Sequence, residues 1–191
     1  MTARFAPRPD GTVAVLIQGP ERAFLASLAS QLRDHLLGAS VEGDAEVEQP
    51  LRRLFPVAYA DDAERDADYQ RLTRDDLMTA RLEQMQALER CATADRLDAD
   101  DVTMCLRALN ALRLVMGTAL DVSEGDDDEM LDADDEHDRP RIQFLYLGHL
   151  LGELVDAATA SANPEGRDYL DGGGPEGRDD GPSLSHDAPI V

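Results

Sequence analysis

The chain of 191 residues is long enough for one ordinary domain with a tail, and its 42% hydrophobic residues suffice for a core. Its 40 acidic and 18 basic residues, all of the latter arginine, give a net charge of −22, which argues against direct nucleic-acid binding and favours a basic protein partner. The N-terminus lacks the apolar run of a signal peptide and no stretch is apolar enough to span a membrane, so we expect a cytoplasmic protein with no membrane association.

The N-terminal residues carry the signal of a β-hairpin. The turn dipeptide Asp10-Gly11 precedes TVAVLIQ, which is rich in strand-forming residues, so two short strands are expected within residues 3–17. The next segment, PERAFLASLASQLRDHLLG, repeats apolar residues at helical spacing. Pro20 suits the first turn of a helix and Gly38 suits its C-terminal end, which predicts a helix over residues 20–38.

Residues 61–91 are predicted to form two successive helices. The pattern DDAERDADYQRLT opens with acids, which favour a helix start, and places Leu72 where it could reach a core. Thr73 with Asp76 three residues later resembles a capping box, so we expect a second helix to begin there and to end near Cys91. The upstream residues 39–50 are polar and loop-like.

Two further helices follow. Asp98 can cap DADDVTMCLRALNALRLVMG, which carries leucines on one face and ends at Gly117. The last helix starts near Pro140, is apolar enough to lie centrally, and ends by Ser161.

The remaining segments are too polar to fold by themselves. Residues 122–138 hold ten acids and no arginine, and the tail is rich in Gly, Pro and Asp, so neither buries enough apolar area to offset its ordering entropy. We therefore predict an all-α fold over residues 1–161, a bundle of about five helices with a small N-terminal β-hairpin. An acidic disordered loop at 122–138 and a disordered tail at 162–191 complete this single-domain chain.

Both cysteines of the chain, Cys91 and Cys105, flank a helix-loop-helix corner. If the two helices were antiparallel, Cys91 would face residue 99 or 100, leaving Cys105 displaced by roughly 8 to 9 Å of axial rise. A disulfide requires Cα atoms within about 7 Å, so the bond would need crossed helices, a longer loop, or fraying at Cys91. The alternative is that Cys105 is a small core hydrophobe and Cys91 an ordinary helix-end residue.

No pattern of catalytic or metal-binding residues accompanies these cysteines. The four histidines show no ligand spacing, the acidic loop lacks the order of a calcium loop, and the glycine run at 172–174 has no flanking strand and helix. We therefore expect no enzymatic activity, no catalytic residues, no metal site and no cofactor.

Three blocks together resemble a known family. They are LFPVAYADDAERDADYQRLTRDDL at 54–77, CLRALNALRLVMGTAL at 105–120 and FLYLGHLLGEL at 144–154. As a set they resemble an actinobacterial domain-of-unknown-function family named for the oxidative stress regulator AosR. The resemblance covers roughly residues 4–158, and none of the blocks is a catalytic motif.

The resemblance implies a cytoplasmic transcription regulator that senses oxidative stress through cysteine thiols and acts with an extracytoplasmic-function (ECF) sigma factor. The family's redox cysteines are spaced by three and then nine residues; Cys91 and Cys105 match the outer two positions, and Asp95 occupies the middle one. Acidic charge would complement the basic surface of a sigma factor. The alternative reading is a non-redox acidic adaptor or scaffold linked to protein turnover or cysteine metabolism.

Overall fold

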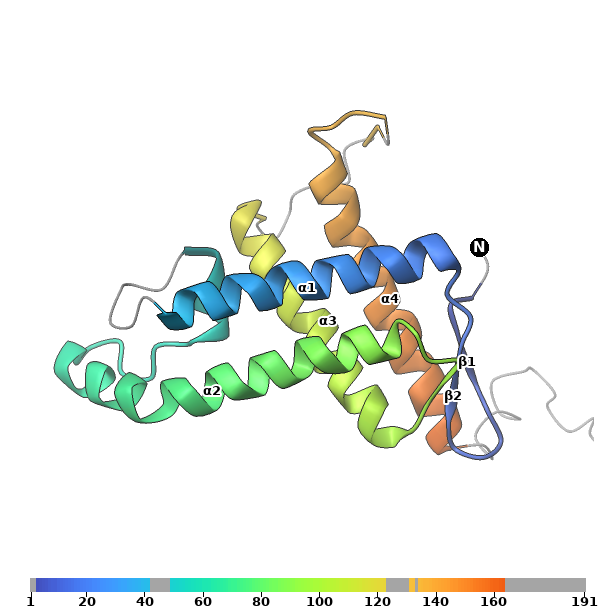
Figure 1. The fold of residues 1–191 in the computed structure, drawn as a ribbon, viewed down its shortest axis with the longest axis horizontal. Coiled ribbons are helices and arrows are strands. Elements are labelled where there is room, and N and C mark those ends of the chain that lie inside the picture. Colours follow the sequence, from blue (N-terminus) through green and yellow to red (C-terminus); the bar gives the residue numbers. More distant parts are fainter. Residues whose placement is uncertain (1–2, 42–48, 123–130, 133, 164–191) are drawn as a thin grey trace, which may run out of the picture.

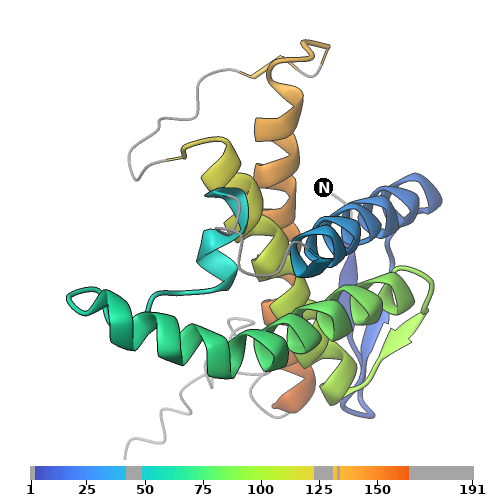
Figure 2. The same ribbon diagram turned by 60° about the vertical axis from the view of Figure 1, so that its left-hand side comes forward.

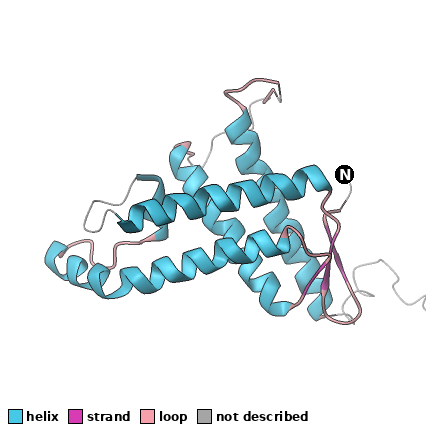
Figure 3. Cartoon of the chain, in the orientation of Figure 1, coloured by secondary structure: helices cyan, strands magenta, loops and turns pink. Residues whose placement is uncertain are grey.

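The computed structural model describes residues 3–41, 49–122, 131–132 and 134–163, and this part of the chain is mostly helical (Figures 1 and 3). Its helices are α1 (Gly19–Val41), the 3₁₀ helix η1 (Gln49–Leu54), α2 (Ala63–Cys91), α3 (Ala99–Ala119) and α4 (Arg139–Ala162). Its strands are β1 (Phe5–Pro7), β2 (Val13–Val15) and β3 (Arg96–Leu97). The predicted helical fold with a small N-terminal hairpin is thus confirmed.

The helices form two layers that cross each other. Helices α1 and α2 run side by side in opposite directions, and α3 and α4 form a second antiparallel pair that crosses behind them (Figures 1 and 2). Apolar faces of both layers meet in one core, as expected when amphipathic helices bury their apolar stripes against each other. The largest fully buried side chains of the helices are Leu36, Leu51, Leu54, Met85, Leu109, Leu147, Leu150 and Leu154.

A small sheet closes one end of the helical layers. Strands β1 and β2 pair antiparallel around the Asp10-Gly11 turn, where Gly11 has a φ of 79° and the Asp10 carboxylate accepts a hydrogen bond from the Thr12 amide at 3.1 Å. The sequence analysis missed β3, which pairs with β2 and places Leu97 opposite Val13. Two residues are too few to show an alternating pattern, so this strand forms only because the hairpin offers it an edge.

Arg4 connects this end of the sheet to two helices. Its backbone amide donates to Glu153 of α4 at 2.7 Å, and its Nε donates to Glu21 of α1 at 2.9 Å. The guanidinium also lies 5.3 Å from the ring centroid of Tyr146. Burial and the nearby charge of Glu21 raise the pKa of Tyr146 to about 12, so its phenol stays protonated throughout the physiological range.

Helix α2 is one continuous helix, which makes the predicted division at Thr73 wrong. Asp62 caps its start by accepting a hydrogen bond from the Arg65 amide at 3.0 Å, whereas the Thr73 hydroxyl donates to the Tyr69 carbonyl at 2.9 Å inside the helix. Leu72 is 81% exposed and does not reach the core, contrary to expectation. The first buried side chain of α2 is Met78; residues 63–76 are exposed or half-buried, and Leu77 packs against the edge of the core.

Glycine marks the helix ends less well than the sequence suggested. Helix α1 continues beyond Gly38 to Val41, and α3 continues beyond Gly117 to Ala119. Gly117 has a packing role instead, because a Cβ atom there would lie 3.1 Å from the Phe144 ring of α4. The predicted cap at Asp98 is confirmed, since its carboxylate accepts from the Asp101 amide at 2.9 Å.

The predicted disorder at 122–138 and 162–191 falls mainly on residues outside the described part of the chain, namely 123–130, 133 and 164–191. Within the acidic segment, the Asp132 amide donates to the Asp138 carboxylate at 2.8 Å just before α4. The predicted domain limits at 161 and 162 stay a prediction.

Substituting Leu150 with Ala should lower the free energy of unfolding by about 2 to 5 kcal/mol, because the side chain is fully buried where both helical layers meet. Denaturant unfolding monitored by circular dichroism measures this change. Leu72→Ala is the matched control, since a side chain that is 81% exposed should alter the unfolding free energy little. Equal losses in the two variants would contradict this account of the core.

Candidate redox site

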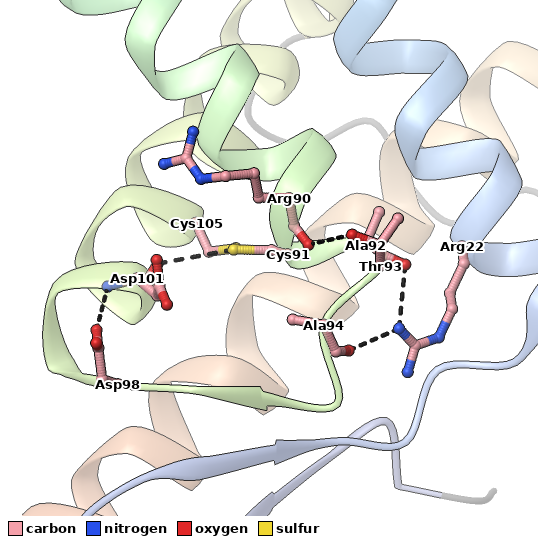
Figure 4. Close-up of a disulfide and its surroundings, with 9 residues drawn as sticks. All are labelled: Arg22, Arg90, Cys91, Ala92, Thr93, Ala94, Asp98, Asp101 and Cys105. Atoms are coloured by element: carbon pink, nitrogen blue, oxygen red, sulfur yellow. Dashed lines mark hydrogen bonds between the residues drawn. A yellow bond between two sulfur atoms is a disulfide. The ribbon is translucent and has the colours of Figure 1, made fainter.

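The structure brings the two cysteines together. Cys91 is the last residue of α2 and Cys105 lies in the second turn of α3, and the two are joined in a disulfide with their Cα atoms 6.9 Å apart (Figure 4). The axial offset expected for antiparallel helices does not keep them apart, because α3 crosses α2 at a steep angle (Figure 1). Of the arrangements that the sequence left open, crossed helices are the one observed.

A short segment between α2 and α3 changes the direction of the chain. After Cys91 the chain turns through Ala92, whose amide donates to carbonyls of the last turn of α2, and then enters β3. The β3 residues pair with β2, so the chain travels along the sheet before Asp98 begins α3. This short detour carries the start of α3 away from the α2 axis, and α3 then passes back beside the end of α2 (Figure 4).

Both sulfur atoms lie inside the core. Cys91 is 5% exposed and Cys105 is 2% exposed. Beside them is a cavity of about 10 Å³ whose other walls are apolar, formed by Phe5, Ile17, Leu25, Leu88, Ala92, Leu109 and Leu150. A cavity of this size and character does not hold a water molecule favourably. An oxidant or reductant therefore reaches the sulfur atoms only when this part of the structure opens.

The position of Cys91 differs from that of a typical reactive cysteine. Reactive cysteines usually lie near a cation or a helix N-terminus, whereas Cys91 is at the C-terminal end of its helix. The Asp101 carbonyl oxygen lies 4.0 Å from its Sγ and can accept a weak bond from a thiol (Figure 4). The position of Cys91 and the burial of both sulfur atoms therefore favour a slow reaction with reagents from solvent.

Arg22 of α1 holds the turn that follows Cys91. Its Nη1 donates to the carbonyl oxygens of Ala92 at 3.1 Å and Ala94 at 2.6 Å (Figure 4). Its Nε and Nη2 donate to the carbonyl oxygens of Ile17 at 2.9 Å and Val15 at 3.3 Å. One guanidinium therefore satisfies backbone acceptors of the sheet, the start of α1 and the turn beside the disulfide.

Sequence reasoning missed Arg22, although a signal existed. A cation in the first turn of a helix is opposed by the helix dipole, so an arginine there needs a compensating partner. That compensation is the set of carbonyl acceptors, together with the Asp95 carboxylate 3.3 Å from Nη2. The side chain of Asp95 itself is 97% exposed.

Two of the described histidines lie near carboxylates. His149 lies 2.8 Å from Glu153 and His137 lies 3.1 Å from Asp135, while His186 is outside the described residues. Within the described ranges, no three His, Cys, Asp or Glu side chains come close enough to hold a metal ion.

These features define a class: a mostly helical domain in which a buried cysteine pair joins two crossed helices. The chain belongs to the family described as "Domain of unknown function (DUF2017)", which matches residues 1–158. No curated protein and no solved structure matches the chain. The expected membership of a domain-of-unknown-function family is thus confirmed, whereas its link with AosR and an actinobacterial origin stays a prediction. Among the helices that the structure describes, none is both long and apolar enough to cross a membrane.

Reducing the disulfide should lower the free energy of unfolding by roughly 3 kcal/mol, because the bond closes a short loop between residues 14 positions apart. Denaturant midpoints measured with and without dithiothreitol test this. The control is Cys105→Ala, which cannot form the bond. Its denaturant midpoint should be the same with and without dithiothreitol. If the reductant leaves the wild-type midpoint unchanged while mass spectrometry shows free thiols, the disulfide contributes no stability.

Arg22→Gln should lower the free energy of unfolding by about 1.5 to 3 kcal/mol, since it removes charge-assisted bonds to backbone carbonyls. It should also speed amide hydrogen exchange at Val15, whose amide donates to the backbone carbonyl oxygen of Asp95 at 3.0 Å. Arg90→Gln is a control of equal charge change, as Arg90 is exposed and next to Cys91. Similar exchange rates in both variants would show that Arg22 does not hold the turn.

Proposed function

We propose that this chain is a cytoplasmic oxidative-stress-responsive regulator, with Cys91 and Cys105 as its thiol switch. The observation that carries the proposal is the meeting of both cysteines of the chain at the crossing of α2 and α3. A bond at this position changes how two helices and the intervening strand are held, so its formation has a structural consequence beyond the sulfur atoms themselves.

The chemistry needs only an oxidant of the peroxide class. One cysteine, as thiolate, attacks a peroxide oxygen, which breaks the O–O bond and yields a sulfenic acid with release of water or an alcohol. The second thiol then attacks the sulfenic sulfur, which forms the disulfide and releases water. Each sulfur loses one electron and the peroxide gains two. A cellular dithiol reverses the process by exchange.

A cytoplasmic location would make a disulfide between Cys91 and Cys105 a sign of redox sensing. Disulfides that persist are uncommon in the reducing cytoplasm, where those that do form are usually catalytic or redox-sensing. Burial makes such a switch slow, because the turn held by Arg22 must open before a reagent can enter. This favours a response to sustained oxidation over detection of brief pulses.

The output would be a protein contact. With a net charge of −22, the chain attracts basic surfaces and repels nucleic acid. The basic DNA-facing surface of an ECF sigma factor is such a surface, and the resemblance noted in the sequence points to the same class of partner. Complementary charge mainly raises the association rate, so we expect binding to weaken as salt increases.

A second candidate is favoured by one observation. Cys91 is 5% exposed and Cys105 2% exposed, as expected for cysteines that serve packing alone. On this reading the chain is a non-redox acidic adaptor or scaffold, and its partner contacts do not depend on the sulfur atoms.

Peroxide should form the disulfide and change the partner binding of the wild type, but should do neither in Cys91→Ala or Cys105→Ala. Thiol state is measured by non-reducing electrophoresis and intact mass, and binding by surface plasmon resonance with purified ECF sigma factors of the source organism. Thr93→Ala is the control, because Thr93 is an exposed neighbour of Cys91 and carries no sulfur. Oxidation with unchanged binding would contradict the regulator and support the adaptor, whereas thiols that resist oxidation in the folded protein would remove the switch.

A further inference from the structure

A pocket of about 170 Å³ opens where η1 lies against the C-terminal half of α3 and the first turns of α4. Figure 2 shows these three segments together, with η1 beside the upper part of α3. The polar groups of the pocket are Arg53, Asn110 and Arg113, and its apolar walls are Leu114, Val122 and Phe144. It lies roughly 12 Å further along α3 than Cys105, so it is separate from the redox site.

Arg113 is held firmly in this pocket. Its guanidinium carbon lies 5.0 Å from the centroid of the Phe144 ring. On α4, a Cβ atom at Gly148 would come within 3.3 Å of Arg113 Cζ and Nε, so glycine allows the guanidinium to lie closer to the α4 backbone than a larger residue would. On α3, Gly117 makes the same allowance for Phe144, with a Cβ contact of 3.1 Å. A glycine of α4 thus lies against the Arg113 guanidinium, and a glycine of α3 lies against the Phe144 ring on which that guanidinium packs.

Within the described part of the chain, the arginines of the pocket have no carboxylate partner. Among the described residues, neither Arg53 nor Arg113 forms an ion pair with a carboxylate, and Arg113 Nε is buried without a hydrogen bond. The chain has 40 acidic residues and 18 arginines, so an arginine is expected to find a carboxylate partner easily. Buried polar groups without a partner are rare in proteins and call for an explanation.

Further positive charge lies beside the pocket. Arg81 of α2 reaches the carbonyl oxygen of Leu54, at the end of η1, with 3.5 Å between Nη2 and that oxygen. Burial and the charge of Arg107 on α3 lower the pKa of Arg81. Among the described residues, η1 and the adjoining parts of α2 and α3 therefore carry several guanidinium groups.

We propose that this pocket binds a small organic anion through a carboxylate or phosphate group. The guanidinium of Arg113 offers two parallel donors to such a group, Arg53 adds a second positive charge, and the Asn110 amide can complete the hydrogen bonding. The apolar body of the ligand would lie against Phe144 and Leu114. A volume of about 170 Å³ is small for a ligand pocket, so the ligand is compact.

The full-length protein is titrated with benzoate, phenyl phosphate and phenol, and binding is followed by isothermal titration calorimetry and by amide chemical shifts. The three probes share a ring and differ in the head group, so they distinguish carboxylate, phosphate and neutral ligands. The buffer contains about 0.15 M salt, which limits the repulsion of anions by the net negative charge of the chain. At least one of the two anions should bind, with shifts at the amides of residues 110–117, and phenol should not.

Arg113→Gln should weaken anion binding at least about tenfold, because it removes a bidentate charge-assisted contact. Arg71→Gln is the matched control for charge, since Arg71 is exposed on α2 and pairs with Asp68 at 3.0 Å. If Arg113→Gln does not fold, Arg53→Gln tests the same site, because Arg53 is exposed. The proposal is overturned if neither anion binds the wild type, if phenol binds equally well, or if Arg71→Gln weakens binding as much as the pocket variants.

Discussion

The contact between the end of α2 and the second turn of α3 is the constraint on which the rest of the structure depends. Here Cys91 meets Cys105, and Arg22 of α1 binds the turn that leaves Cys91. The same turn continues into β3, which joins the hairpin. Helices α1, α2 and α3 and the sheet are therefore connected within a few residues of this crossing, and Leu150 of α4 lines the cavity beside both cysteines. A covalent bond at this place can thus influence most of the domain.

Much of the fold could be predicted from the sequence, because amphipathic helices reveal their apolar faces through periodicity. Helix α3, with its cap at Asp98, and the hairpin at Asp10-Gly11 are examples in which local chemistry decides the structure. The false division at Thr73 shows the limit: a capping pattern inside a helix is indistinguishable from one at its start when the surrounding residues are polar. Strand β3 depends on a neighbour that lies far away in the chain, so no local pattern reveals it.

The candidate site was predictable in its residues but not in its geometry. Cysteines can be found by inspection, whereas the distance between them depends on a crossing angle that helical periodicity does not contain. Arg22 and the Arg113 pocket are both assembled from residues on several elements. In each case the sequence shows only an arginine in an unusual setting. The carbonyls, glycines and aromatic ring that explain it become neighbours only in the folded chain.

The first half of α2 combines many exposed positions with a few fixed contacts. Residues 63–76 are exposed or half-buried, although they form an unbroken helix with the buried residues that follow. The exposed positions of this segment can therefore vary while the interior stays intact, provided that the Asp62 cap, the hydrogen bonds of Asp66 and Gln70 to residues 56–59 and the helix-forming residues are kept. Related chains could thus differ in the partners that bind this segment while sharing the same core. A label attached at one of its exposed positions would leave the core undisturbed.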